Sequence, residues 1–176
     1  LVCCRTFGMF AYYETEEVPL ERLLSNLEQR LAKNTNDFEV TYQLARIHSM
    51  AYATNLTQLD VIKETGMPMF SQPGEDTGVP EIVQVYKSMP ARKAALKHLT
   101  NAITLYGRSL VLLQRSTNAY PWQIIPAQLG QAWCLDQSGQ RDKALDAYRK
   151  ALRVAWKQEV TGDFNFKEWV KDAWND

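Results

Sequence analysis

The chain has 176 residues, of which 45% are hydrophobic, so it is long enough to form one domain with a sizeable core. Its 20 Lys and Arg residues balance 20 Asp and Glu residues, which leaves no net charge to attract a phosphate backbone or an anionic membrane. No apolar run approaches the roughly 18 residues that a membrane span requires. The composition therefore argues against a nucleic-acid partner and against a membrane span.

Residues 1–18 form an N-terminal segment that precedes the first helical pattern. It begins Leu1-Val2-Cys3-Cys4 without a methionine and continues with aromatic residues such as Phe7 and Phe10. We interpret it as the remnant of a cleaved or truncated export segment, which favours a periplasmic or secreted location over the cytoplasm. An N-terminal strand that packs on the first helix, or a fragment boundary, is the alternative.

Residues 19–176 are predicted to form a single helical domain that starts with an amphipathic packing helix. Its leucines recur at the three- and four-residue spacing of one helical face, so they form an apolar stripe that needs a partner surface. The stripe consists of Leu20, Leu23, Leu24, Leu27 and Leu31. At the other end of the domain, the aromatic-rich segment 163–175 is predicted to form a capping helix.

The segment 121–158 has the pattern of a helical hairpin. Gly139 ends its first helix, and Ala144, Tyr148 and Ala151 share one face of the second. Small residues on that face let two helices approach closely, and Ala132 stands twelve positions before Ala144 on the first helix. Tight helix-against-helix contact is therefore expected at these alanines.

The segment 37–106 repeats the pattern, with Ala95 and Ala102 on the second helix and Ala45 on the first. Fifty positions separate Ala45 from Ala95, where the other hairpin has twelve, so residues 54–90 are predicted to be an insertion. Its stretch 66–80 holds three prolines and three glycines, which cannot continue a helix. We interpret it as a lid that lies over one face of the helices, or as an excursion that fills a gap between hairpins.

These alanine patterns resemble the tetratricopeptide (TPR) repeat, a helix-turn-helix unit of about 34 residues, and are similar to uncharacterised bacterial TPR proteins that are often exported. The resemblance covers about two thirds of the chain. It implies an all-α fold of stacked antiparallel hairpins, an α-α superhelix, with a long insertion in the first hairpin and capping helices at the ends. A plain helical bundle without repeat ancestry is the alternative.

In proteins of this family the front helices of successive hairpins line a concave groove that binds a peptide or protein segment. The resemblance therefore implies binding residues on two front helices of this chain. Tyrosine and tryptophan would supply rigid apolar area, and an arginine would hold a carboxylate through two hydrogen bonds. The candidates are Tyr42, Arg46, Ser49, Leu129, Trp133 and Asp136. Burial in the core is the alternative for Tyr42, Leu129 and Trp133.

Nothing in the sequence indicates a catalytic, cofactor or metal site. The three cysteines lack the spacing of a zinc site or a disulfide framework, and no motif links His48 and His98 to Cys134 as an activating base. We therefore predict a non-catalytic protein–protein interaction scaffold without a cofactor. The alternatives are a structural protein that self-associates through Trp169 and Trp174 in the C-terminal tail, and an enzyme that uses the insertion as a substrate cover.

Overall fold

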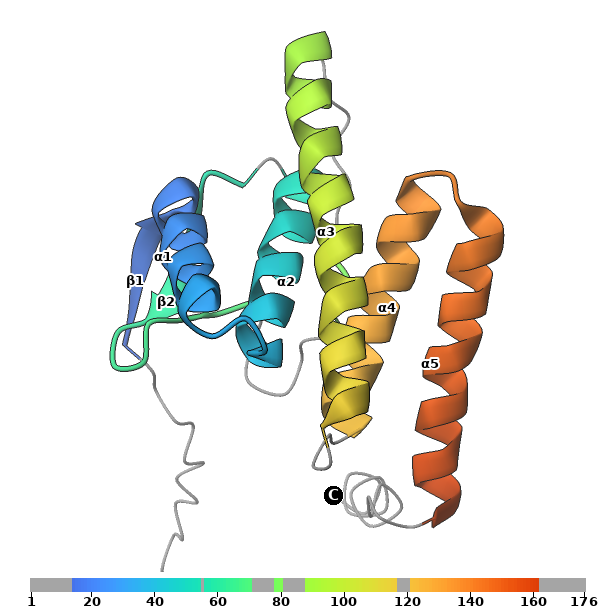
Figure 1. Cartoon of the computed structure of the whole chain (residues 1–176). Coiled ribbons are helices and arrows are strands. Elements are labelled where there is room, and N and C mark those ends of the chain that lie inside the picture. The colour runs from blue at the N-terminus through green and yellow to red at the C-terminus, as the bar shows by residue number, and fades with distance from the viewer. Residues whose placement is uncertain (1–13, 55, 71–77, 81–87, 117–120, 162–176) are drawn as a thin grey trace, which may run out of the picture.

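The computed structural model describes residues 14–54, 56–70, 78–80, 88–116 and 121–161 (Figure 1). The predicted capping helix at 163–175 and most of the N-terminal segment lie outside these residues. The described residues form five helices and three short strands. The helices are α1 (Leu20–Lys33), α2 (Phe38–Thr54), α3 (Met89–Arg115), α4 (Pro121–Gln137) and α5 (Arg141–Thr161), and the strands are β1 (Thr15–Pro19), β2 (Gln58–Ile62) and β3 (Met67–Pro68).

The predicted leucine stripe does form the buried face of α1. Leu20, Leu23, Leu27 and Leu31 are buried, and Leu24 is half-buried against the same core. The stripe packs with α2 and with a small antiparallel sheet in which β2 lies between β1 and β3. The buried strand residues include Val18 on β1, which pairs with Leu59 on β2.

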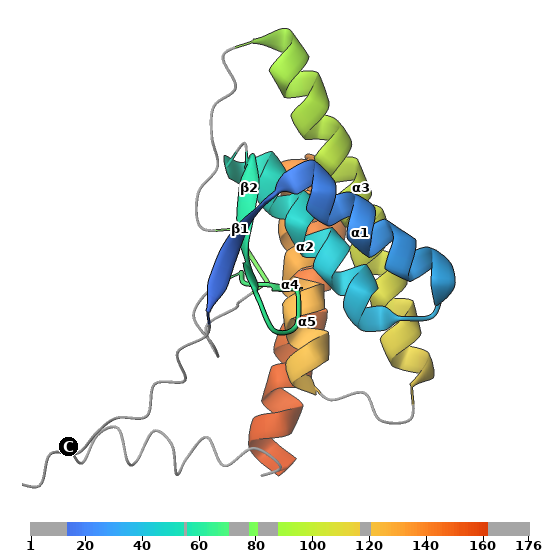
Figure 2. The ribbon, with the colours of Figure 1, turned by 90° about the vertical axis from the view of Figure 1, so that its left-hand side faces the viewer.

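Helix α2 is the central element of the fold. It lies between α1 and the sheet on one side and α3 and α4 on the other (Figures 1 and 2). Val40, Leu44 and Ile47 face the first group, whereas Ala45 and Ala53 face the second. Burial on both sides explains why polar residues of this helix are also enclosed.

Helix α3 packs along α2, and the predicted close contact is confirmed by the burial of its small residues. Ala95 is 4% exposed and Ala102 is fully buried, as is Ala45 on the facing helix. The helix is longer than the predicted hairpin boundary at residue 106, because Leu113 continues its buried face by two further turns. Its N-terminal end projects beyond the other helices (Figures 1 and 2), and Met89 is 75% exposed there.

Helices α4 and α5 form the second hairpin at the place that the sequence predicts. Gly139 adopts a φ of 79°, a left-handed conformation that favours glycine, and ends the turn between the two helices. Ala132, Ala144 and Ala151 are all buried, which confirms tight packing at these positions. The hairpin packs against the rest of the molecule through the contact of α4 with α3.

The fold is therefore predominantly helical, as predicted, and the described part of 90–158 contains no strand. The all-α prediction is confirmed in this coarse sense, and the structure adds a small sheet to it. One of its strands comes from the N-terminal segment and two come from the predicted insertion, where alternating burial of Leu59 and Val61 stabilises a strand rather than a loop. No helix among the described residues has both the length and the apolar character needed to cross a membrane.

Candidate functional site

Two of the three predicted residues of α2, Tyr42 and Ser49, lie against the buried Tyr106, and the third, Arg46, lies next to Ser49. Arg46 is 4% exposed and Ser49 is fully buried, whereas Tyr42 is half-buried. The rings of Tyr42 and Tyr106 meet edge to face, with centroids 6.0 Å apart. The Ser49 hydroxyl lies 3.3 Å from the Tyr106 hydroxyl. These three residues are therefore close together, but only Tyr42 lines a cavity.

The three predicted residues of α4 are not brought together at one site. Trp133 is 8% exposed, and its ring packs edge to face against Tyr52 of α2 at 5.9 Å. Leu129 is half-buried and Asp136 is exposed near the end of the helix. Trp133 thus joins α2 to α4 within the core, as the alternative interpretation for this residue anticipates.

Tyr106 connects three parts of the chain through its hydroxyl. It donates a hydrogen bond to the carbonyl oxygen of Gly78 at 3.2 Å, while the Ser49 hydroxyl donates to the carbonyl oxygen of Arg46 at 2.7 Å. The tyrosine is fully buried. Its ring packs against α4 at Gly130, where the Cβ atom of any other residue would overlap the ring. This contact fixes α3 against both α2 and α4.

A cavity of about 610 Å³ lies between α2, α4, the end of α3 and the segment 67–70, and we call it the front pocket. Its walls are mainly apolar and aromatic, which is typical of cavities that bind an organic ligand or a side chain of a partner. The lining residues are Phe38, Glu39, Tyr42 and Gln43 of α2, Met67, Pro68 and Phe70, Ser109 and Leu113 of α3, and Gln123, Ile125 and Pro126 of α4.

Gln43 is the unusual residue of the front pocket. It is 4% exposed, and among the described residues its Oε1 atom has no hydrogen-bond partner. A buried amide oxygen without a partner costs about 1–3 kcal/mol, so proteins rarely leave one in this state. A ligand that donates a hydrogen bond inside the pocket would remove this cost.

Arg46 of α2 contacts two described parts of the insertion, at Phe70 and at Val79. The Arg46 guanidinium lies 5.6 Å from the centroid of the Phe70 ring, and its Nη2 atom donates to the carbonyl oxygen of Val79 at 3.4 Å. Gly78 has a φ of 77°, and a Cβ there would overlap the carbonyl group of Pro126 on α4. Arg46 thus holds the insertion, which forms one wall of the front pocket, against α2. The insertion in turn helps to enclose the Arg46 side chain.

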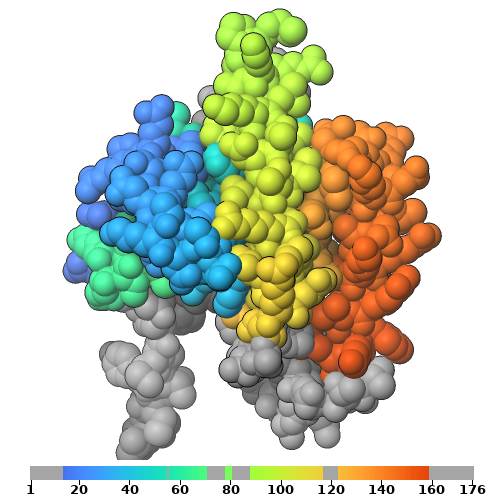
Figure 3. Space-filling view, viewed as in Figure 1, coloured from blue at the N-terminus to red at the C-terminus, as the bar shows by residue number. Residues whose placement is uncertain are grey.

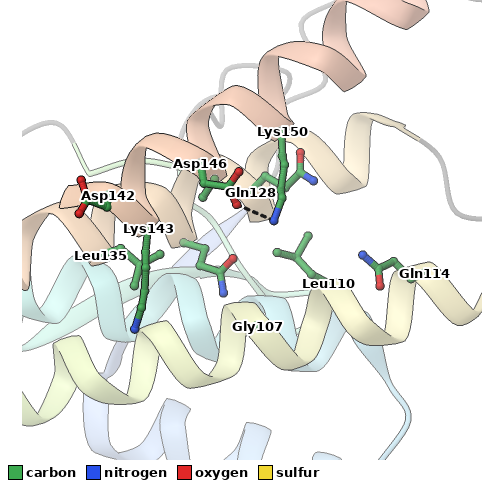
Figure 4. A pocket seen from close by; sticks show the side chains of 11 residues that line it. Gly107, Leu110, Gln114, Gln128, Leu135, Asp142, Lys143, Asp146 and Lys150 are labelled. Atoms are coloured by element: carbon green, nitrogen blue, oxygen red, sulfur yellow. Dashed lines mark ion pairs between the residues drawn. The ribbon is translucent and has the colours of Figure 1, made fainter. Parts of the chain in front are cut away.

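A second cavity, of about 490 Å³, lies between α3 and α5 with α4 as its floor, and we call it the rear groove. Figure 3 shows the furrow between these two helices, and Figure 4 shows Lys143 and Lys150 extending from α5 toward the side of α3 that carries Leu110 and Gln114. Its other lining residues are Gly107, Gln128, Gln131, Leu135, Asp142, Asp146 and Ala147. Three of the eleven are glutamines, so the rear groove is richer in amides than the front pocket.

The two histidines meet between α2 and α3, although no sequence motif links them. Their Nδ1 atoms are 2.7 Å apart, so one ring donates and the other accepts. Burial, together with the neighbouring His98 and Lys97, lowers the pKa of His48 to about 4. Burial and Lys97 also lower the pKa of His98. The pair is therefore neutral near pH 7 and serves as a hydrogen bond between helices.

Cys134 is fully buried on α4, and burial raises the pKa of its thiol to about 12. A thiol with so high a pKa is not a nucleophile near neutral pH. Among the described residues, no group of three or more His, Cys, Asp or Glu side chains is placed to hold a metal ion.

The sequence did not single out Gln43 or the three glutamines of the rear groove. Their signal is weak, because a glutamine on a helix is usually a solvated surface residue. Gln43 stands next to Tyr42 in a helix whose residues are buried on both sides, and this enclosure is visible only in the fold. Met67 and Phe70 belong to the stretch 66–80, for which a lid over the helices is one of the two interpretations, and they line the front pocket.

Comparisons with known proteins add no identification, because no protein-family model, no curated protein and no solved structure matches the chain.

Proposed function

We propose that the protein is a non-catalytic interaction scaffold that binds a peptide or protein segment in the front pocket. The observation that carries this proposal is Gln43, which lines a mainly apolar cavity and whose buried Oε1 atom has no partner among the described residues. Such a combination of mainly apolar walls and a few polar groups suits the recognition of one side chain and its adjacent main chain.

The chemistry of the pocket defines the occupant. Phe38, Tyr42 and Phe70 offer aromatic surface to an apolar side chain, and the Gln43 oxygen accepts a hydrogen bond from a neighbouring N–H group. Glu39 is exposed at the rim, where it favours a partner that carries a nearby positive charge. The best occupant is therefore an aliphatic or aromatic residue within a segment that is not acidic.

The arrangement of the helices is consistent with a TPR-like scaffold. Two antiparallel pairs, α2 with α3 and α4 with α5, lie side by side (Figure 1), and the first helix of each pair contributes to the front pocket. This is the face on which the family binds its partners. The TPR relationship itself forms part of the proposal.

Selection from a library of displayed random peptides, followed by calorimetric titration, tests the proposal. We expect the selected peptides to share an apolar residue and to bind the wild-type protein with a measurable affinity. Ile125→Glu places a charge in the pocket wall and should abolish this binding. Val111→Glu is the matched control, because Val111 is 44% exposed on α3 and lines neither cavity.

Gln43→Leu is a second variant that separates binding from folding. It removes the buried amide oxygen, so the fold should be as stable as the wild type or more stable, while affinity for the selected peptides falls by about five- to tenfold. Failure to select any peptide, or equal binding by wild-type protein and Ile125→Glu, would contradict the proposal.

A second candidate function, self-association, is favoured by the outer face of α5. Leu145, Leu152 and Trp156 follow one another on this face and are 48%, 67% and 68% exposed. They are followed by the aromatic tail that the sequence predicts to dock on a neighbouring copy. Light scattering that shows a dimer, and a monomer for both Trp156→Glu and Trp174→Ala, would support this function, whereas a monomeric wild-type protein would exclude it.

A further inference from the structure

The rear groove is built from different residues and different chemistry than the front pocket. We infer that the rear groove is a second binding site, which holds the main chain of an extended peptide through the side-chain amides of its glutamines. The inference does not rest on the function proposed for the front pocket, because the two cavities share no lining residue.

The glutamines supply the hydrogen-bonding groups that a peptide backbone needs. Gln114, Gln128 and Gln131 come from two helices and line the same cavity. A side-chain amide carries both a donor and an acceptor, as a peptide group does, so it pairs with main chain irrespective of sequence. The Oε1 atom of Gln128 is enclosed and has no hydrogen-bond partner among the described residues, so a rotation of the amide that turns this atom into the groove toward a backbone N–H group would gain a hydrogen bond.

The length of the groove fits a short extended segment. The lining residues span 107–114 on α3, 128–135 on α4 and 142–150 on α5. About seven residues of helix correspond to a length of roughly 10 Å. An extended chain advances about 3.3 Å per residue, so the groove accommodates about three residues.

The charges of the rear groove cancel. Asp142 and Asp146 balance Lys143 and Lys150, and the Lys150 ammonium lies 2.7 Å from the Asp146 carboxylate. A groove of this kind has no net attraction for a phosphate group or an acidic peptide. The apolar part of its lining includes Leu110 of α3, Leu135 of α4 and Ala147 of α5, which suit a small aliphatic side chain. The occupant is therefore an uncharged extended segment rather than an anion.

The two cavities lie on different sides of α4, which allows both to be occupied at once. At about 3.6 residues per turn, Gln128, Gln131 and Leu135 share one side of this helix, and Pro126 of the front pocket points to the opposite side. A ligand in one cavity therefore does not block the other.

Nuclear magnetic resonance titration with the capped peptide N-acetyl-Ala-Leu-Ala-N-methylamide tests the inference. Millimolar peptide should shift the side-chain amide signals of Gln114, Gln128 and Gln131 together, with a single apparent affinity. A version of the peptide with methylated backbone nitrogens lacks the donors and should cause no saturable shift. The apparent affinity should change less than about twofold between low and high salt, because the lining charges cancel.

Two glutamine variants on the same helix provide a matched comparison. Gln128→Leu should weaken peptide binding by about five- to tenfold, whereas Gln137→Leu, at a position that lines neither cavity, should leave it unchanged. Gln131→Leu is the alternative should Gln128→Leu fail to fold, and it should weaken binding in the same direction. The absence of saturable shifts, equal binding of the methylated peptide, or shifts confined to the front pocket would each overturn the inference.

Discussion

The front pocket and the rear groove lie on two sides of one helix, α4, but differ in how firmly their walls are held. The front pocket is walled by core residues such as Leu113, which is 2% exposed, and by the insertion that Arg46 attaches to α2. The rear groove is walled by half-buried and exposed side chains of α3 and α5, such as Leu110 and Lys143. Each cavity contains one buried amide oxygen without a partner among the described residues.

The difference shows how the surroundings of a side-chain amide determine what it recognises. In the front pocket two amides, those of Gln43 and Gln123, lie among mainly aromatic and aliphatic groups, so we expect apolar contact to supply most of the binding free energy. In the rear groove three amides lie among balanced charges, so we expect directional hydrogen bonds to determine which segment the proposed site binds. The following predictions test whether the two sites differ in their dependence on the core.

The largest expected effect is on stability, when a leucine in the wall of each cavity is shortened to alanine. Leu113→Ala removes a side chain from the core cluster of α2, α3 and α4, and we expect it to lower the free energy of unfolding by about 2–5 kcal/mol. Leu110→Ala alters the rear groove and should cost about 1 kcal/mol, because Leu110 is only half-buried. Urea denaturation measures both, and equal losses would show that the groove wall belongs to the core.

The next effect is a loss of stability in acid that arises from the pair of His48 and His98. Because the pKa of His48 is lowered to about 4 in the folded protein, the unfolded chain binds a proton first as the pH falls from about 6.5. Stability due to this group is complete above pH 6.5 and is lost toward pH 4. We expect a loss of about 2–3 kcal/mol between pH 7 and pH 4.5.

The control for the acid effect is His48→Gln, which removes the titrating ring and keeps a polar side chain at that position. The difference between wild-type protein and this variant isolates the histidine from the carboxylates, which also titrate in acid. Denaturation curves at the two pH values give this difference. An equal dependence on pH in both proteins would show that His48 does not carry the effect.

A smaller effect on stability is expected when two glycines that face different environments are replaced by alanine. Gly130→Ala places a methyl group against the buried ring of Tyr106, and we expect a loss of about 1–3 kcal/mol. Gly107→Ala places it 3.1 Å from Nε2 of Gln131, the end of a flexible side chain in the rear groove, so the better helix propensity of alanine should compensate. Thermal unfolding of the two variants checks this order, and a less stable Gly107→Ala would contradict it.

Much of the helical framework follows from short-range patterns in the sequence. The leucine spacing of α1, the alanines of the two hairpins and the turn at Gly139 each depend on one helix or one turn, and all are present in the structure. An N-terminal strand was only an alternative interpretation, and its pairing in a sheet was not predicted, because β1 pairs with residues about forty or more positions away and each strand has at most five residues. Pairing over such a distance leaves little trace in the local pattern.

The candidate site was less predictable than the fold. Tyr42 lies at the front pocket, but the neighbouring Gln43 was missed and the burial of Arg46 was not anticipated. Adjacent residues of a helix point about 100° apart, so the choice among them requires knowing what packs on each side. For α2 that information comes from residues of α1, α3 and the insertion.

The enclosure of α2 on both sides has a consequence for hydrogen exchange. Its backbone amides are shielded by α1, the sheet and α3, so local fraying does not expose its central turns. Deuterium would enter this helix only when the whole molecule opens, and its exchange rate would report the global free energy of unfolding. The projecting first turns of α3, which none of the other described helices or strands covers, would take up deuterium much faster in the same experiment.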